Sequence, residues 1–302
     1  MSFDFETELK NKTARVEEIV SFYLPKPEGY ASTVMEAMNY SAMAGGKRLR
    51  PLMIMEANSL VGGDGKLIGP FMAALEMIHN YSLVHDDLPA MDNDELRRGM
   101  PTTWVKYGDG MAVLAGDALL NYSMETAVKA FELTDDFDET KRIAWALKVL
   151  FGYSGIYGMI GGQCADLEAE KKGMNVSKDN LLYIHENKTA ALIRAALVIG
   201  AILGGADKET VDKLTTVGFN IGIAFQIQDD ILDVISTSDE LGKPVGSDER
   251  NEKATYVSLE GLDASKAEVL RLSNEAMDIL ASFENRNLFL EELVKSLISR
   301  RK

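Results

Sequence analysis

The sequence predicts an all-α protein, a large helical bundle, and three observations lead to this fold class. Apolar residues recur at helical spacing along most of the chain, and we find no convincing period-two strand of useful length. Two segments, "ALIRAALVIGAIL" (191–203) and "FNIGIAFQIQDDILDVI" (219–235), are apolar on most sides, as is typical of interior helices. No Ser/Gly-rich linker or low-complexity segment divides residues 1–302, so we expect a single domain.

The expected helices are separated by Gly, Pro and acidic turns. A C-terminal helix is indicated by apolar residues at helical spacing from Val269 to Phe283, with Ser265 and Glu268 as a capping box in front. The longest polar stretch, "STSDELGKPVGSDERNEKATY" (236–256), is expected to form a mobile surface loop. The other segments expected to be helical are 5–22, 31–43, 68–86, 105–131, 138–160, 178–204 and 208–235.

Composition narrows the class of protein. With 46% hydrophobic residues among 302, the chain can bury a substantial core, and its net charge of −15 argues against nucleic acid as a partner. The single cysteine, Cys164, rules out an intramolecular disulfide, fits a reducing cytoplasm and is assigned to packing. The acidic N-terminus is unlike a secretory signal, and the most apolar run (195–205) is too short to cross a bilayer. We therefore expect a cytoplasmic protein without a transmembrane segment.

Carboxylates gather in the segment "YSLVHDDLPAMDNDELRRG" (81–99), which follows an apolar, helix-like run. Pro89 disfavours helix in the residue before it, so the helix should end near Asp87. Asp92 can then turn back toward Asp86 at the end of the helix. Carboxylates at a helix C-terminus oppose the macrodipole, so this cluster needs a positive partner.

A second cluster, "QDDILD" (228–233), places Asp229 and Asp233 at i, i+4 on one face of an apolar helix, with Asp230 beside them. Like charges at this spacing repel. Mg²⁺ takes oxygen ligands and is typically held by one or two carboxylates, with water and phosphate oxygens completing its shell. Two such clusters on apolar helices favour a metal site over solvated acidic surfaces.

Basic residues indicate what the metal would hold. Arg side chains bind phosphate oxygens in a bidentate manner, and Lys acts as a point charge. Two glycines precede the first basic group in "GGKRLRP" (45–51), where backbone can approach a ligand closely. Diphosphate esters would use both the cations and the metal clusters. The basic candidates are Lys47, Arg48, Arg50, Arg97, Arg98, Lys188, Lys243 and Lys253.

Five ordered motifs resemble those of the trans-isoprenyl diphosphate synthases, and within them the bacterial farnesyl diphosphate synthases. They are "GGKRLRP", "HDDLPAMDNDELRRG", "HENKTAALI", "FQIQDDILD" and "GKPVGSDERNEKATY", and the resemblance covers residues 44–256. It implies an all-helical fold around a deep central cavity, with the two acidic motifs facing each other across its mouth. It also implies a homodimer and small diphosphate substrates.

The resemblance further implies a role for each matching position. Mg²⁺, as three ions once substrate is bound and with Mn²⁺ as an alternative, would be held by Asp86, Asp87, Asp92, Asp229 and Asp233. The allylic substrate would be contacted by Arg97, Lys188, Thr189, Gln226, Lys243 and Lys253. Isopentenyl diphosphate would be bound by Lys47, Arg50, His79 and Arg98. The catalytic residues are expected to be Asp86, Asp87, Asp92, Lys188, Thr189, Gln226 and Asp229, while His85 and His185 are assigned structural roles.

The chemistry needs no side-chain nucleophile. Metal ions and cations stabilise departing diphosphate, so the allylic C–O bond ionises and the isopentenyl double bond attacks the cation head-to-tail. The released diphosphate is the expected base. Water would quench the cation, so segment 236–256 is a candidate lid and the tail "SRRK" (299–302) could close over the second diphosphate.

Product length should depend on the floor of the cavity. Tyr81 precedes Asp86 by five residues, about 7.5 Å along a helix, and Ser82 follows it. A ring at this depth predicts farnesyl diphosphate, with geranylgeranyl diphosphate as the alternative. Two other classes stay open, but a terpene cyclase would not need "GGKRLRP", and a non-catalytic subunit would be expected to lack one acidic motif.

Overall fold

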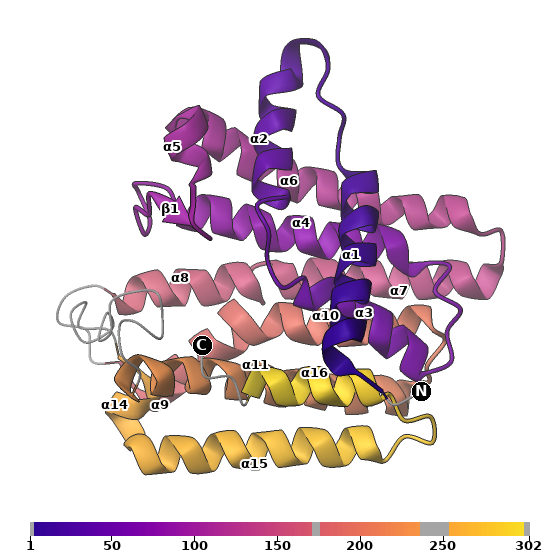
Figure 1. Cartoon of the computed structure of the whole chain (residues 1–302), viewed down its shortest axis with the longest axis vertical. Helices are drawn as coiled ribbons and strands as arrows, with labels where there is room; N and C mark the ends of the chain where they lie inside the picture. The colour runs from indigo at the N-terminus through magenta and orange to yellow at the C-terminus, as the bar shows by residue number, and fades with distance from the viewer. Residues whose placement is uncertain (1–2, 171–175, 236–253, 299–302) are drawn as a thin grey trace.

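The computed structural model describes residues 3–170, 176–235 and 254–298, and it confirms the all-α prediction (Figure 1). Strands within these residues are limited to one hairpin, in which β1 (Leu96–Arg97) pairs antiparallel with β2 (Met100–Pro101). The α-helices are α1 (Phe5–Tyr23), α2 (Ser32–Ala42), α3 (Leu49–Leu60), α4 (Ile68–Asp86), α5 (Thr103–Tyr107), α6 (Asp109–Val128), α7 (Phe137–Ser154), α8 (Met159–Ala169), α9 (Lys178–Ile184), α10 (Ala191–Leu203), α11 (Lys208–Ile235), α14 (Tyr256–Glu260), α15 (Leu262–Ala281) and α16 (Leu288–Ile298).

The long helices α4, α6, α10, α11 and α15 lie side by side, and α1 and α2 run across them (Figure 1). Helix α10 is the centre of the bundle because it packs on α3, α7 and α11, and every one of its residues except Arg194 is buried. One apolar cluster extends from Val16 in α1 to Leu297 in α16, so the first and last helices share a core. This rigid interior carries the ends of α4 and α11, where the acidic clusters lie.

The end of α4 agrees with its sequence signals. The helix ends at Asp86, three residues before Pro89, and the chain then turns back. The backbone N–H of Asp92 donates to the carbonyl oxygen of Asp86 across 2.8 Å, which brings the two ends of the first acidic cluster together. The predicted return of Asp92 toward the helix is therefore confirmed.

Three expected helices are interrupted. The segment 105–131 is divided at Gly108 into α5 and α6, and the segment 138–160 is divided between α7 and α8. The segment 178–204 contains a π-helical turn, His185–Ala190, between α9 and α10. Helices α3, α14 and α16 and most of α8 lie outside the expected segments. Helix α3 carries Pro51 in its first turn, where a missing N–H does no harm.

The capping box predicted at Ser265 and Glu268 is wrong. Helix α15 begins earlier, after Gly261, and Ser265 is buried inside it with its hydroxyl donating to the Gly261 carbonyl oxygen. The signal failed because a Ser inside a helix can satisfy its hydroxyl by bonding back to the preceding turn. The segments 236–253 and 299–302 lie outside the described residues, and with them the mobile loop, the lid, the closing tail, Lys243 and Lys253.

One stretch of the described residues, Phe137–Ala169, has the length and apolar composition of a membrane span, and 39% of its most apolar 18-residue window is buried. In the structure this stretch is not a single rod, because α7 ends at Ser154 and α8 begins at Met159. Helix α7 also packs on the central helix α10. The same composition is typical of a core helix in a bundle of this size.

Candidate active site

Asp86 of the first acidic cluster faces a cavity at the end of α4 with a volume of about 800 Å³. Asp86 lines this cavity, and Gln163 of α8 donates its amide N–H to Asp86 Oδ1 across 2.8 Å. Burial raises the pKa of Asp86 from 3.8 to about 6, and the positive charge of Lys188 offsets part of this effect. The free protein thus holds a carboxylate whose charge needs a cation.

Asp87 points to a different partner. Its carboxylate is 3% exposed and accepts a hydrogen bond from Arg97 Nε at 2.7 Å. Burial raises the pKa of Asp87, and this hydrogen bond lowers it in part. Asp92 is exposed at the entrance. The predicted metal-binding role of Asp87 would require its pairing with Arg97 to loosen when substrate arrives.

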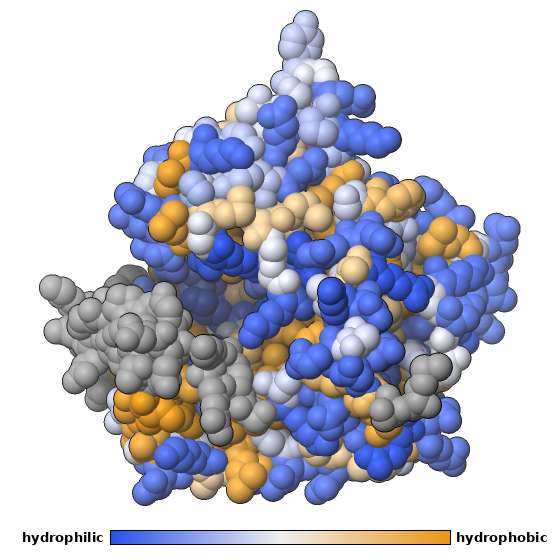
Figure 2. Space-filling model, viewed as in Figure 1, coloured by the Kyte–Doolittle hydropathy of each residue, from blue (hydrophilic) through white to orange (hydrophobic). Residues whose placement is uncertain are grey.

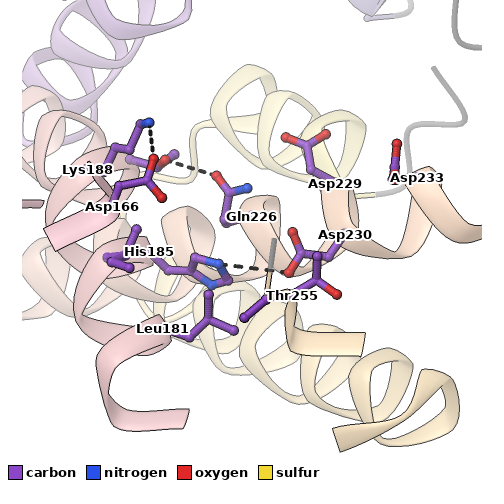
Figure 3. A pocket seen from close by; sticks show the side chains of 12 residues that line it. Asp166, Leu181, His185, Lys188, Gln226, Asp229, Asp230, Asp233 and Thr255 are labelled. Carbon is purple, nitrogen blue, oxygen red and sulfur yellow. Dashed lines mark hydrogen bonds and ion pairs between the residues drawn. The ribbon is translucent and has the colours of Figure 1, made fainter. Parts of the chain in front are cut away.

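The second acidic cluster faces a pocket of about 200 Å³. Asp229 and Asp233 point the same way from α11, as their i, i+4 spacing predicts, whereas Asp230 turns toward Thr255 (Figure 3). Asp230 accepts a hydrogen bond from the backbone N–H of Tyr256 at 2.7 Å and lies 3.9 Å from buried His185. Asp230 therefore anchors the start of α14. His185, predicted to be structural, also lines this pocket.

Lys188 and Thr189 line both of the cavities that the acidic clusters face. A π-helical turn places these consecutive residues on the wall of both the 800 Å³ cavity and the 200 Å³ pocket. A π turn widens the helix, and such turns occur frequently at functional sites. Lys188 Nζ lies 2.5 Å from Asp166 Oδ2, and Thr189 Oγ1 donates to Gln226 Oε1 across 3.0 Å (Figure 3). Both acidic clusters therefore face one connected region.

The surface is hollowed between the layer with α4 and β1 and the layer with α8 and α11, and hydrophilic residues lie inside the hollow (Figure 2). Beside it is a cavity of about 620 Å³ lined by the predicted isopentenyl diphosphate set, Lys47, Arg50, His79 and Arg98. Arg98 donates to the carbonyl oxygen of Gly45, which fixes the glycine turn against the cavity. The four residues predicted from separate motifs thus converge.

Arg48 is the basic candidate with a buried partner. Its backbone is left-handed, with φ of 49°, and its fully buried guanidinium lies 2.8 Å from Glu76 Oε1. The side chain is occupied by this buried ion pair, and a buried charge that lost its partner would be strongly destabilising. Arg48 also lines the 620 Å³ cavity beside Lys47 and Arg50, so it stays a basic candidate whose side chain is held by Glu76.

His79 is held in its neutral form. Desolvation by burial lowers its pKa well below 6.5, and the positive charges of Arg50, Arg98, Arg97 and Arg48 lower it further. Since the unfolded chain takes up a proton near pH 6.5 and the folded protein does not, acidification favours unfolding.

We expect the free energy of unfolding of His79→Gln to fall less than that of the wild type as pH drops below 6.5. The difference should reach at most about 1.4 kcal/mol per pH unit, because glutamine carries no titrating group. Urea unfolding at pH 7.5, 6.5 and 5.5 measures it. Parallel pH curves for the two proteins would contradict the neutral state of His79.

Tyr81 and Ser82, both predicted to set product length, line the 800 Å³ cavity. Burial raises the pKa of Tyr81 to about 12, and the nearby Asp86 carboxylate adds to this, so the hydroxyl remains protonated. The packing role predicted for Cys164 is wrong, because this residue is exposed and lines the cavity. His85 also lines the cavity and so contacts the site directly.

The donor set fits a metal held jointly by protein and substrate. Across the described ranges, no three His, Cys, Asp or Glu side chains converge closely enough to bind a metal ion by themselves. Instead, Asp86 lines the 800 Å³ cavity and Asp229 lines the 200 Å³ pocket, and Lys188 lines both. Mg²⁺ is usually bound by one or two carboxylates with the remaining positions filled by water and phosphate, and this arrangement fits that pattern.

Sequence reasoning missed two polar residues of α8, Gln163 and Asp166. Gln163 contacts Asp86 of the first acidic motif, and Asp166 contacts Lys188 of the motif "HENKTAALI". Their spacing of three residues places them on one face of a helix, in the otherwise small and apolar segment "GGQCADL" (161–167). That spacing was the available signal, but their partners could only be identified once α8 was positioned beside the π-helical turn.

Gly162 allows this close approach. A Cβ at this position would lie 2.1 Å from the backbone nitrogen of Lys188 and 2.6 Å from the carbonyl carbon of Asn187, so backbone would have to move. Gly152 of α7 has no atom within 4 Å of the corresponding Cβ position.

Gly162→Ala is expected to lower the rate of product formation by about 100-fold and to lower the melting temperature, because it displaces Lys188 and Thr189. Gly152→Ala is the matched control and should raise stability slightly or leave it unchanged. Steady-state kinetics and thermal unfolding of both variants provide the comparison. Equal behaviour of the two alanine variants would show that the π-helical turn tolerates displacement.

Two acidic clusters and two groups of cations around connected polar and apolar cavities define an all-α enzyme that handles diphosphates with hydrocarbon tails. The chain matches the Polyprenyl synthetase family model over residues 31–286, and it belongs to that family.

Individual relatives agree with this assignment. The chain is 44% identical to a dimethylallyltranstransferase of Fischerella ambigua, over 90% of this chain and 77% of the relative. It is 43% identical to a farnesyl diphosphate synthase of Geobacillus stearothermophilus, over 85% of each chain. Among solved structures, a geranyltransferase of Helicobacter pylori complexed with magnesium and isoprenyl diphosphate superposes with a TM-score of 0.81 at 32% identity, covering 99% of this chain and 97% of that one.

Proposed function

We propose that this protein condenses isopentenyl diphosphate head-to-tail with dimethylallyl and then geranyl diphosphate, giving farnesyl diphosphate. The observation that carries the proposal is the arrangement of three cavities. The acidic pocket and the apolar cavity share Lys188 and Thr189 as lining residues, and the cationic cavity shares Arg50 and His79 with the apolar one. One cavity suits each diphosphate, and the apolar cavity suits the growing chain. The whole chain would act as one catalytic domain.

The allylic diphosphate would lie between the two acidic clusters. Mg²⁺ held there, as three ions with substrate bound and with Mn²⁺ as a substitute, would neutralise the diphosphate and assist its departure. The carboxylates in this role are Asp86, Asp87, Asp92, Asp229 and Asp233. Arg97 and Lys188 would exchange their carboxylate partners for phosphate oxygens, and Lys243 and Lys253 would contribute from the segment 236–253.

The allylic carbons would lie beside Thr189 and Gln226, whose side chains are hydrogen-bonded to each other. Oxygen dipoles there can stabilise the developing cation without trapping it. Isopentenyl diphosphate would be held by Lys47, Arg50, His79 and Arg98, with its double bond toward the cation. The departed diphosphate would remove the proton. His79 is neutral, but its assigned role is to bind isopentenyl diphosphate.

Product length is the finer part of this proposal. Tyr81 and Ser82 line the apolar cavity beyond Asp86, and the Ser82 hydroxyl is satisfied by the carbonyl oxygen of His79. A ring at Tyr81 leaves limited depth for hydrocarbon, which favours the fifteen-carbon product. Relatives named geranylgeranyl diphosphate synthase also match this chain, so the twenty-carbon product is the competing outcome.

The test is incubation with labelled isopentenyl diphosphate, dimethylallyl diphosphate and Mg²⁺, followed by chromatography of the dephosphorylated alcohols. Farnesol would support both the chemistry and the chain length. Geranylgeraniol would keep the chemistry and reject the proposed floor. No metal-dependent elongation would reject the synthase proposal and favour a non-catalytic subunit, whereas a cyclic hydrocarbon would favour a terpene cyclase.

We also propose a homodimer that acts in the cytoplasm. Exposed apolar side chains on α6 and α7, including Leu114 at 55% and Phe151 at 41%, support a contact with a second copy at these helices. Burial of such side chains in an interface would remove apolar surface from water. Sedimentation equilibrium tests the assembly, and a monomer at micromolar concentration would count against it.

A further inference from the structure

The apolar cavity contains a pair of rings, Tyr81 and His85, and the proposed function gives a role only to Tyr81. Tyr81 and His85 are one helical turn apart on α4, and both line the 800 Å³ cavity. Their ring centroids are 5.9 Å apart with an interplanar angle of 81°, an edge-to-face contact. Aromatic pairs favour this geometry, so each ring restrains the other.

Hydrogen bonding does not fix the Tyr81 ring. Its hydroxyl is buried, and no residue in the described part of the chain forms a hydrogen bond with it. A buried tyrosine hydroxyl usually finds a partner, so Tyr81 is unusual in this respect. The position of its ring must therefore depend on packing, and the edge-to-face contact with His85 is part of that packing.

His85 is fixed from the other side by α6. Its Nε2 lies 3.1 Å from the carbonyl oxygen of Val113. A carbonyl only accepts, so Nε2 carries the proton and donates. Asp117 Oδ1 is 3.8 Å from the same nitrogen. The His85 ring is consequently held by α6, a helix that carries none of the residues assigned to catalysis.

The ring reaches α6 because residue 116 is glycine. A Cβ on Gly116 would lie 2.1 Å from His85 Nε2 and 2.3 Å from His85 Cδ2, well inside contact distance. Gly116 thus provides a slot that admits the imidazole edge. Leu120, one turn further along α6, lines the cavity beside the two rings.

We propose that His85, seated in the slot at Gly116, is a positioning residue that holds the Tyr81 ring as the end wall of the prenyl cavity. Product length is then set by the contact of α4 with α6 at these three residues, and not by the identity of residue 81 alone. The inference rests on the proposed function and deepens it by naming what fixes the floor.

The experiment compares wild type with His85→Ala, Gly116→Ala, the double variant and Tyr81→Ala, using the labelled elongation assay. For His85→Ala we expect the ratio of twenty- to fifteen-carbon product to rise at least about tenfold, because the Tyr81 ring loses its support. Gly116→Ala should slow turnover by about tenfold, because the new methyl group expels the imidazole from its slot. The double variant should regain turnover and keep the longer product, since no ring remains to be expelled.

Gly110→Ala is the matched control on α6, because its Cβ would meet no atom within 4 Å. It should change neither rate nor product. A His85→Ala enzyme with the wild-type product ratio, beside a Tyr81→Ala enzyme with longer products, would overturn the inference. A double variant as slow as Gly116→Ala would do the same.

Failure of the proposed function would look different, because wild type itself would then elongate nothing. The product ratio does not depend on how much protein is folded. If Gly116→Ala is unstable, the ratios from His85→Ala and the double variant still decide the matter.

Discussion

Asp86→Asn is expected to lower the rate of elongation by about 10³-fold or more while making the metal-free protein more stable. The activity falls because the amide cannot supply the negative charge that holds the metal against the diphosphate. The stability rises because burial disfavours the charged form of the wild-type carboxylate, and the neutral amide avoids this cost. Its pKa is raised to about 6, mainly by burial.

The sign of the pH dependence follows from that pKa. The folded protein holds the Asp86 proton up to about pH 6, whereas the unfolded chain releases it near 3.8, so the cost of the charged form is absent at low pH. The advantage of Asp86→Asn should therefore grow between about pH 4 and 6 and level off above, at about 1–3 kcal/mol. Urea unfolding from pH 4 to 8 in the presence of a chelator measures it.

Asp92→Asn provides the comparison for this prediction. The side chain belongs to the same cluster but is exposed, so its replacement should reduce activity and change stability by no more than about 0.5 kcal/mol. Adding Mg²⁺ and a diphosphate should reverse the order of stability of Asp86→Asn and wild type. An Asp86→Asn protein that is active, or no more stable than wild type, would remove Asp86 from the metal site.

Tyr81→Ala is expected to change the main product from fifteen to twenty carbons or longer. Removing a buried ring opens space beyond Ser82, and the hydrocarbon of farnesyl diphosphate can enter it while its diphosphate remains in place. The competing pathway, release of the fifteen-carbon product, is then slower than a further condensation. Chromatography of the alcohols over a time course gives the ratio directly.

Tyr81→Phe is the matched control, because the Tyr81 hydroxyl has no partner among the described residues. The phenylalanine variant should keep the fifteen-carbon product, with stability equal to or slightly above wild type. Farnesol as the sole product of Tyr81→Ala would show that another part of the cavity stops growth.

The sequence by itself determined the fold class and the identity of the charged clusters. Helical spacing of apolar residues predicts α4 and α11, because burying one face of a helix is a local requirement that each segment expresses in its own pattern. Pro89 marks the end of α4 for an equally local reason, since proline restricts the residue before it. Asp229 and Asp233 share a face because four residues make about one helical turn.

Only the tertiary structure decided which partner each of those charged side chains has. Arg48 and Arg50 occur in the same short motif and line the same cavity, yet the buried Arg48 is the one that forms an ion pair with Glu76. Asp229 and Asp230 are adjacent, yet Asp230 holds the backbone of Tyr256. Neighbouring residues on a helix point about 100° apart, so their roles depend on which elements pack on each side.

The same limit explains the residues that sequence reasoning missed. Gln163 and Asp166 have no charge pattern of their own, and they enter the site because Gly162 lets α8 approach the π-helical turn. The sequence predicts continuous helix through this turn, because a π-helical turn of six residues (His185–Ala190) between two helices has no composition signal of its own. Local patterns fix helices and their faces, whereas long-range packing brings Lys188, Asp86 and Asp229 to one region.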